Sequence, residues 1–579
     1  MNHLLAFAAG VAAQVLVFSR GEWDSHSRDI VVGFVLLNAA STLALRTSAS
    51  FALDWPTALW TATTLELAAL AGLFSSMLAY RAFFHALRRF PGPFSARLSN
   101  FHMVTIAKRF RTYREVQQLH EHYGDIVRTG PSTLSVAKLE AVQAIHGPRS
   151  KCRKGPWYEH SRPLRSVHTN RDPASHSQQR MSWDRGLNSA ALRDYAPMVA
   201  KSTEALIERI KAYEGKTFDA NKWFNLFSFE VMGWMAFGRP FDLLATGKKT
   251  YFMELVQKSV DNVGIFANIS WLYVLLKQIP VLNAKYQQFL RWLRPQLKSQ
   301  MKEPTGWRTL FSTILKDYPT YEELTEMQHR ILEGDMFLII VAGSDTVGVT
   351  MEDLFYELSV NRDVQKKLQE EVDAYFAENN EPDPTLLAKL DYLQACINET
   401  LRLWPPVPSG TQRVTPPEGL QVGDAFIPGN TIVQVPTYTV HRSTPTLPES
   451  SPPNRHYADL NTGEEAFAHP NEFIPERWTT KPELIKDRSV FHPFSVGEST
   501  PPMVVTNIVD DTKKLENLGK YSCVGKQLAL AELRQVTVEI LRRFDVELAP
   551  GFGSDDFKNG LRDHFTLEAS KLDLTFTAR

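Results

Sequence analysis

Cys523 is the residue whose surroundings point most clearly to chemistry. It lies in the run KYSCVGKQLA at 520–529, and the run FHPFSVG at 491–497 comes before it after an interruption. Helical periodicity follows from 527 to 542, so the thiol precedes a helix N-terminus, where the helix dipole stabilises a thiolate. A thiolate is a strong electron-donating ligand of haem iron, and Gly525 lets the backbone approach a flat macrocycle. The alternative is a buried, inert cysteine, which is the usual state of a free thiol.

A second group combines a carboxylate with two guanidinium groups. Glu399 and Arg402 are three residues apart on a predicted helix, so they share one face and can pair through two hydrogen bonds. Arg477, in the run FIPERW at 473–478, could complete a buried cluster of one glutamate and two arginines. For the first two residues, the alternative is an ordinary surface ion pair, which is worth little.

Asp345 and Thr346 place an acid and a hydroxyl inside an apolar stretch that is predicted to be a helix from 331 to 355. Gly343 disfavours this helix by about 1 kcal/mol relative to alanine, so it needs a structural reason. A glycine that opens the helix beside these side chains would leave room for dioxygen and a proton relay. The alternative, which is the simpler interpretation of this motif alone, is a notch where another helix packs.

His176 and Arg180 lie one helical turn apart, and Arg413 follows the helix that contains Glu399. Basic side chains at these places can pair with the propionate groups of a haem. Basic residues on the surface would explain them equally well.

The composition narrows the class of protein that must hold these residues. The chain has 579 residues, enough for a large core, and equal numbers of basic and acidic residues, 64 each, which argues against a nucleic-acid-binding protein. Its three cysteines exclude a disulfide framework and a cysteine-rich zinc site. Neither GxSxG nor HExxH occurs, so a hydrolase finds no support.

The N-terminal region contains three apolar stretches, at 4–18, 30–45 and 60–80. Only the third clearly reaches the roughly 20 residues that span a bilayer as a helix. Arg81 and two further arginines at 88–89 follow it, and positive charge at this exit favours a cytosolic location for everything downstream. We therefore expect residues 1–89 to form a membrane anchor with up to three transmembrane helices, followed by a stiff proline hinge.

The remaining chain, 90–579, is predicted to be one mainly α domain with a minor β part. Helical periodicity recurs, for example at 195–213 and 364–376, whereas alternating or β-branched runs with glycine and proline predict strands at 127–137 and 420–436. Helices must therefore position most of the residues described above.

The order of these residues resembles the cytochrome P450 family of haem-thiolate monooxygenases: Asp345 and Thr346, then Glu399 and Arg402, then Arg477, then Cys523 near the C-terminus. The resemblance covers the chain from about residue 90 to its end. It implies a mainly α cytochrome P450 fold, Cys523 as the axial ligand of the haem iron, and Asp345 and Thr346 in oxygen activation. It also implies that the Glu–Arg–Arg cluster stabilises the core.

The resemblance further implies a set of haem contacts: Phe494 and Gly525 in the cysteine loop, and Arg413, His176 and Arg180 at the propionates. The sequence departs from the family pattern at two of the surrounding positions. His176 stands where the family commonly has tryptophan, and Tyr521 stands where it often has arginine or histidine.

Partners and a location follow from the same resemblance. No GxGxxG dinucleotide fingerprint occurs, so the electrons of NADPH must arrive through a separate NADPH–cytochrome P450 reductase. The expected substrate is an apolar small molecule, and no nucleic-acid partner is expected. The N-terminal helices and the hinge resemble those of microsomal members, which implies the endoplasmic reticulum membrane with the catalytic domain in the cytosol. The stretch at 146–158 is similar to fungal members that act in secondary metabolism.

Two stretches, 443–463 and 498–519, interrupt the family pattern, the second of them inside the cysteine loop. Their end residues permit splice-site codons, and their removal gives the continuous runs HREEAF and VGKYSC. The hypothesis is that both are introns translated in frame. The alternative is a pair of genuine loops.

The predicted reaction is the hydroxylation of an apolar small molecule with O₂ and two electrons from the reductase. Two other classes stay open. One is a haem-thiolate isomerase or dehydratase, which would not need Asp345 and Thr346. The other is an inactive protein whose interrupted cysteine loop fails to hold haem.

Overall fold

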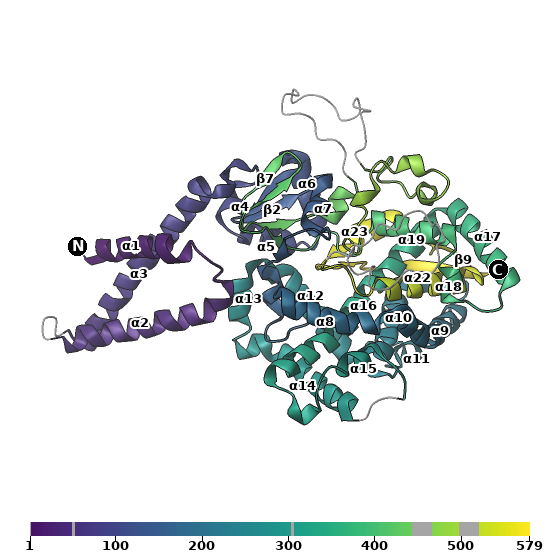
Figure 1. Ribbon diagram of the computed structural model, residues 1–579, viewed down its shortest axis with the longest axis horizontal. Helices are drawn as coiled ribbons and strands as arrows, with labels where there is room; N and C mark the ends of the chain where they lie inside the picture. The colour runs from purple at the N-terminus through teal and green to yellow at the C-terminus, as the bar shows by residue number, and fades with distance from the viewer. Residues whose placement is uncertain (1, 49–52, 303–305, 443–465, 497–519) are drawn as a thin grey trace, which may run out of the picture.

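Three apolar helices at the N-terminus extend from one side of the body of the protein (Figure 1). The computed structural model describes residues 2–48, 53–302, 306–442, 466–496 and 520–579. The three helices are α1 (Asn2–Ala13, continued as a π-helix over Gln14–Phe18), α2 (Ser27–Thr47) and α3 (Trp55–Ala79, continued over Tyr80–Phe84). Asp24–Thr47 and Trp55–Phe84 have the length and hydropathy of membrane spans, whereas Asn2–Phe18 is a shorter apolar helix.

The shorter first helix is packed tightly against the third. A Cβ on Gly10 would lie 1.8 Å from the Ala69 carbonyl oxygen, and a Cβ on Gly72 would lie 2.1 Å from the Phe7 carbonyl oxygen. The two backbones therefore touch at these glycines, as small residues allow in many membrane helix pairs. This contact gives α1 a fixed place beside a helix that is long enough to span a bilayer.

The middle of the body is occupied by α16, Glu326–Val360 (Figure 1). It is apolar enough to pass for a membrane span, but most of its apolar stretch is buried inside the protein, so it is a core helix. The helix α10 (Ala220–Phe237) packs along it over many residues. The helices predicted at 331–355 and 195–213 are confirmed, the second as α9 (Ser189–Ala212).

Two further helices hold predicted site residues: α19 (Asp391–Leu403) and α22 (Lys526–Leu541). The other helices of the body are α4 (Phe94–Leu98), α5 (Phe101–Ala107), α6 (Thr112–Tyr123), α7 (Leu139–His146), α8 (Pro173–Gly186), α11 (Leu243–Thr246), α12 (Tyr251–Phe266), α13 (Ser270–Leu276), α14 (Pro280–Lys302), α15 (Leu310–Leu315), α17 (Arg362–Glu378), α18 (Pro384–Leu387), α20 (Thr437–Val440) and α23 (Ser554–Gly560). The predicted mainly α class with a minor β part is confirmed.

The main sheet has the strand order β1-β2-β8-β5-β3. Its strands are β1 (Ile126–Gly130), β2 (Thr133–Val136), β8 (Ile432–Gln434), β5 (Arg413–Val414) and β3 (Arg153–Lys154), which confirms strands within 127–137 and 420–436. The pair β2–β8 is parallel and the other pairs are antiparallel. The register of β3 against β5 sets Lys154 directly opposite Arg413.

The remaining strands form small antiparallel sheets away from the main sheet. They are β4 (Thr217–Asp219), β12 (Asp573–Ala578) and β9 (Phe544–Leu548) in one sheet, the pair β6 (Leu420–Val422) and β7 (Ala425–Ile427), and the pair β10 (Arg562–Asp563) and β11 (Leu567–Glu568). The interruptions of the family pattern at 443–463 and 498–519 lie outside the described residues.

Candidate functional site

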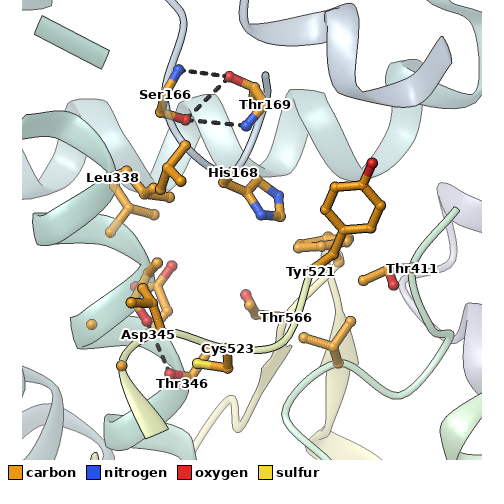
Figure 2. Close-up of a pocket in the computed structure, with 18 of the residues that line it drawn as sticks. Ser166, His168, Thr169, Leu338, Asp345, Thr346, Thr411, Tyr521, Cys523 and Thr566 are labelled. Carbon is orange, nitrogen blue, oxygen red and sulfur yellow. Dashed lines mark hydrogen bonds between the residues drawn. The ribbon is translucent and has the colours of Figure 1, made fainter. Parts of the chain in front are cut away.

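A cavity of about 420 Å³ lies between α16 and the loop that precedes α22. It is large enough for a cofactor or a small organic molecule. Its lining includes all eight residues predicted for catalysis or cofactor binding: Asp345, Thr346, Cys523, Arg413, His176, Arg180, Phe494 and Gly525. Figure 2 shows Asp345 and Thr346 next to Cys523, with Tyr521 on the other side of the cavity. Tertiary structure thus brings together residues from segments far apart in the sequence.

Cys523 is held at the start of α22 by local geometry. Its backbone N–H donates to the Phe494 carbonyl oxygen at 2.9 Å, which joins the two described sides of the cysteine loop. The thiol lies deep in the protein, and its exposed surface faces the cavity. Burial raises the pKa of the thiol, while the Gly525 N–H and the positive charge of Arg180 act in the opposite direction. Burial therefore outweighs the effect of the helix N-terminus on the pKa of this thiol, and a bound metal cation would favour the thiolate.

Gly525 leaves space beside the sulfur. A Cβ at this position would lie 3.9 Å from the Cys523 Sγ and would meet no other neighbouring side chain. Gly525 lines the cavity, so a side chain here would take up space close to the sulfur. The absence of a side chain at this position therefore fits a macrocycle.

The helix α16 continues without a break past Gly343. The Thr346 hydroxyl donates to the Ala342 carbonyl oxygen at 2.9 Å, and a Cβ on Gly343 would lie 2.1 Å from the Met232 Sδ of α10. The expectation that this glycine opens the helix is wrong, because the space at Gly343 is filled by the close packing of α10. Room for a ligand comes instead from the cavity on the face that carries Ala342 and Thr346.

Asp345 lies on the same helix and has an unusual protonation equilibrium. Burial, with a further contribution from the negative charge of Glu568, raises the pKa of Asp345 to about 7. The carboxyl group is therefore poised to take up and release protons near neutral pH.

A cluster of cations lines another side of the cavity. The basic cluster consists of Lys154, Arg180 and Arg413, with His176 beside it. The Lys154 Nζ donates to the Val167 carbonyl oxygen at 2.8 Å, and the Arg413 Nη1 donates to the Tyr158 hydroxyl at 2.7 Å.

Two of the three cations of the basic cluster have no carboxylate partner among the described residues. The Arg180 Nε pairs with the Asp184 carboxylate at 2.8 Å, whereas Lys154 and Arg413 form no such pair. Burial and the charges of Arg413 and Arg180 lower the pKa of Lys154 well below its usual value, and burial lowers that of His176 to about 3. The buried Arg413 Nε has no hydrogen-bond acceptor among the described residues. Buried cations in this state call for an anionic ligand, and two carboxylates of a haem would satisfy them.

Lys154 was not assigned a role from the sequence. It belongs to the run at 146–158, but it lies far along the chain from Arg413, and only the β3–β5 register places the two side by side. The same cluster explains the tyrosine at position 521, because the Tyr521 ring centroid lies 5.0 Å from both the Lys154 Nζ and the Arg413 Cζ. An aromatic face stabilises two cations where a further basic residue would repel them.

Two aromatic rings form one part of the cavity wall. The Trp157 and Phe565 rings are stacked with centroids 4.5 Å apart, and both line the cavity. Phe565 sits at the turn between β10 and β11 with φ of 95°, a strained value for a side chain of this size. The turn therefore directs an aromatic ring inward at a cost in backbone strain.

Glu399 lies at the centre of a fully buried ion cluster outside the cavity. Its Oε1 accepts from the Arg402 Nη2 at 2.8 Å and from the Arg477 Nε at 2.9 Å, and all three side chains have 0% exposure. The Trp478 ring N–H and the Ile474 backbone N–H complete the shell at 2.9 and 3.0 Å. Burial alone would raise the pKa of Glu399, but the two guanidinium groups outweigh burial and lower it. The cluster ties α19 to the segment that leads toward the cysteine loop.

The chain matches known proteins over most of its length. The family model for cytochrome P450 matches residues 91–449. "Cytochrome P450 monooxygenase FCK2" of Fusarium pseudograminearum is 44% identical over 583 residues, covering 100% of this chain and 98% of the relative. "Cytochrome P450 monooxygenase phqL" of Penicillium fellutanum is 36% identical, covering 99% and 94%.

A third relative bears on the run at 146–158. "Tryprostatin B 6-hydroxylase" of Aspergillus fumigatus is 33% identical over 513 residues, covering 88% of this chain and 84% of the relative. The predicted similarity of the chain to fungal members that act in secondary metabolism is confirmed by this match over most of its length.

The Glu399 cluster leads to a prediction about stability. Glu399→Gln leaves two buried arginines without their counter-charge and is expected to lower the free energy of unfolding by about 3–5 kcal/mol. The exposed pair of Asp373 with Arg579 at 2.7 Å provides the control, and Asp373→Asn should cost about 1 kcal/mol or less. Urea unfolding of both variants measures the difference. Because the pKa of Glu399 is lowered by folding, its contribution is present near neutral pH and is lost on acidification. An equal fall in the free energy of unfolding in both variants would contradict the predicted contribution of Glu399 to stability.

The basic cluster leads to a prediction about ligand affinity. Lys154→Met removes one buried cation, so the affinity of the apoprotein for haem should fall by about 10- to 100-fold. The apoprotein itself should not lose stability, because repulsion with Arg413 is relieved. Haem titration of the apoprotein, followed by its absorption, measures the affinity. Lys151→Met is the matched control, because Lys151 is exposed and pairs with Glu418 at 3.1 Å on the surface. The same affinity in both variants would remove Lys154 from the haem site.

Proposed function

The chain belongs to the cytochrome P450 family of monooxygenases, and from this premise we propose that it is a membrane-anchored enzyme that hydroxylates an apolar small molecule. The observation that carries the proposal is the convergence of Cys523, Asp345 and Thr346, and the basic cluster on one cavity. A thiol on one side, cations for two carboxylates on another and a proton-exchanging acid next to the thiol form the donor set that a haem monooxygenase needs.

Different residues of the cavity would hold different parts of the cofactor. Cys523 would bind the haem iron, Gly525 and Phe494 would lie against the macrocycle, and the basic cluster with His176 would hold the propionates. When bound, haem supplies the centre at which O₂ is reduced and one oxygen atom is inserted into a C–H bond, with two electrons and two protons consumed and one water released. The burial that raises the pKa of the thiol also keeps bulk water away from the reacting groups.

Thr346 and Asp345 would control protons at the reacting position. The Thr346 hydroxyl donates its own proton to the Ala342 carbonyl, so its oxygen is left as an acceptor that can orient a water molecule in the cavity. Asp345, with a pKa of about 7, can give up a proton and take up another within one turnover at neutral pH.

The substrate is proposed to be a flat, apolar compound of fungal secondary metabolism, such as an indole alkaloid. The stacked Trp157 and Phe565 rings and the apolar side chains of α16 support a planar apolar ligand. The Aspergillus fumigatus relative is named as a hydroxylase of tryprostatin B, which supports this substrate class.

The partner and the location follow the family pattern. The electron donor is proposed to be NADPH–cytochrome P450 reductase, since the chain has no dinucleotide fingerprint of its own. Residues 1–89 are proposed to anchor the protein in the endoplasmic reticulum membrane, with 90–579 as the haem-thiolate domain in the cytosol. The two long apolar helices and the arginines that follow them support this arrangement.

The interruptions at 443–463 and 498–519 are proposed to be translated introns. The family match ends at 449, inside the first of them. The bond between the Cys523 N–H and the Phe494 carbonyl brings the described sides of the cysteine loop together, which supports a loop that is complete without 498–519.

A carbon-monoxide difference spectrum of the reduced protein tests both proposals. The variant that lacks 443–463 and 498–519 is expected to give a strongly red-shifted Soret band, because the thiolate is then bound to haem, and Cys523→Ser in that variant should abolish the band. Absence of the band in the shortened variant would contradict the haem-thiolate assignment. Sequencing of spliced transcripts decides the intron proposal separately, since both segments would be missing from the mature message.

Asp345→Asn and Thr346→Ala test the proton step. Product formation is expected to fall by roughly 10²-fold, with more of the electrons recovered as hydrogen peroxide, because proton delivery is lost while electron delivery is not. In the unmodified protein, product formation should decline as the pH rises through about 7, where Asp345 loses its proton, and this inflection should vanish in Asp345→Asn.

Asp353→Asn is the matched control for these variants. Asp353 is a buried acid on the same helix that does not line the cavity, and burial raises its pKa well above the ordinary value, so an amide resembles its neutral form. Product formation that needs no O₂ would instead indicate an isomerase or dehydratase.

A further inference from the structure

A second, smaller cavity lies on the other side of Asp345. Its volume is about 30 Å³, which is room for a water molecule. It is lined by Asn225, Asp261, Asp345, Val349, Glu352, His564, Thr566, Leu567 and Glu568. Three of these residues, Asp345, His564 and Thr566, also line the main cavity. Asp345 therefore forms part of the boundary between the two cavities.

The helix α16 presents acids to this second cavity through its periodicity. Asp345, Val349 and Glu352 are spaced by four and three residues, so they lie on one face of the helix. Glu352 accepts a hydrogen bond from the Asn221 side chain at 3.1 Å, and burial raises its pKa well above the ordinary value. Asp345, with a pKa of about 7, is an acid on this face that can exchange protons near neutral pH.

His564 reaches the cavity because α12 comes very close to the β10–β11 hairpin. A Cβ on Gly264 would lie 2.9 Å from the His564 carbonyl oxygen, so only a glycine permits this approach. One turn earlier on α12, the Asp261 Oδ1 lies 2.8 Å from the His564 Nδ1. On the other side of the ring, the Glu568 Oε2 lies 3.5 Å from the Nε2. The imidazole lies between two carboxylates, and neither ring nitrogen makes a hydrogen bond of good geometry to a described residue.

These groups form a graded path from solvent to the interior. The side chains of Asp261 and Glu568 are 45% and 37% exposed, whereas that of His564 is 3% exposed. Burial lowers the pKa of His564 to about 4, with Arg562 acting in the same direction and Asp261 against it. A neutral imidazole can accept a proton on one nitrogen while it releases one from the other.

We propose that the second cavity is the proton inlet of the site, in which a water molecule links Asp345 to His564 and, through Asp261 and Glu568, to solvent. The proposal rests on the proposed oxygen-dependent function, which consumes two protons in each turnover. In each transfer, a proton passes from the His564 ring to the cavity water while the water gives one to the Asp345 carboxylate. The ring regains a proton on its other nitrogen from the solvent side, so His564 and the water end as they began and the Asp345 carboxylate gains one proton.

Three variants test this path by coupling. His564→Phe keeps a ring against Phe110, whose centroid lies 4.2 Å away, but removes the relay. Glu568→Gln and Asp261→Asn each remove one solvent-facing carboxylate. For His564→Phe the yield of product per electron should fall by about tenfold or more, with a larger solvent isotope effect and an unchanged rate of electron delivery. Smaller falls are expected for the two carboxylate variants.

Glu254→Gln is the control on the same helix, since Glu254 is exposed and lies two turns before Asp261. Its coupling should match that of the unmodified protein. An unchanged coupling in His564→Phe, or an equal fall in Glu254→Gln, would overturn the inlet.

A second readout does not depend on turnover. The carboxyl stretching band of Asp345, identified by its loss in Asp345→Asn, can be followed by infrared spectroscopy. After mixing with D₂O, exchange of the Asp345 proton should slow by about tenfold or more in His564→Phe, because the connection to solvent is broken.

The same band tests the electrostatic environment of Asp345. Glu568→Gln should lower the titration midpoint of Asp345, because a negative charge that raises the pKa is removed. The charge of Lys249 acts in the opposite direction. The other titratable groups around the same cavity are Asp261, Glu352 and His564. Slowed exchange in a protein that hydroxylates nothing would support the inlet and contradict the proposed reaction. Unchanged exchange in a protein that does hydroxylate would contradict the inlet alone.

Discussion

A single buried carboxylate, Glu399, anchors the part of the chain that leads to the reactive thiol. It accepts hydrogen bonds from Arg402 on its own helix and from Arg477 and Trp478 on the following segment. The two arginines in turn donate to the carbonyl groups of Pro470 and Ala468, at 2.6 and 2.7 Å. An unpaired buried charge is far more costly than a paired one, so each member fixes the others in place. The segment that precedes the cysteine loop has little regular secondary structure, and this network supplies the rigidity that hydrogen bonds of a helix or strand would otherwise provide.

The main cavity is organised by charge as well as by shape. Lys154, Arg180 and Arg413 concentrate positive charge on one side, while Asp345 and the acids around the second cavity lie on another. Burial shifts the pKa toward the neutral form in one member of each group, downward for Lys154 and upward for Asp345. Desolvation is the common cause. The consequences differ. Lys154 and Arg413 have no carboxylate partner among the described residues and would accept one from a cofactor, whereas Asp345 can exchange protons near neutral pH without a further partner.

The N-terminal helices are connected to the body by more than the chain that follows them. The segment between α1 and α2 carries Glu22, whose two carboxylate oxygens accept from Arg171 at 2.6 and 2.9 Å. Arg171 also donates to the backbone of Lys154, so this ion pair is adjacent to the basic cluster. Lys277, which lines the cavity, directly follows α13. The helix α13 packs against the start of α2. The N-terminal helices and the wall of the cavity are therefore linked by direct contacts.

The sequence alone determined those features that arise within one element. Cys523 precedes α22, Glu399 and Arg402 share a face of α19, and His176 and Arg180 share a face of α8, because helical spacing fixes neighbours three or four residues apart. The mainly α class followed from the same periodicity, and the order of the motifs identified the family. Contacts between distant elements could not be read this way. The pairing of Lys154 with Arg413 depends on strand register, the reason for Gly343 is a methionine on α10, and the inlet around His564 is assembled from four elements. Such contacts are set by how whole elements pack, so only the tertiary structure decided which buried charges meet and which face the cavity.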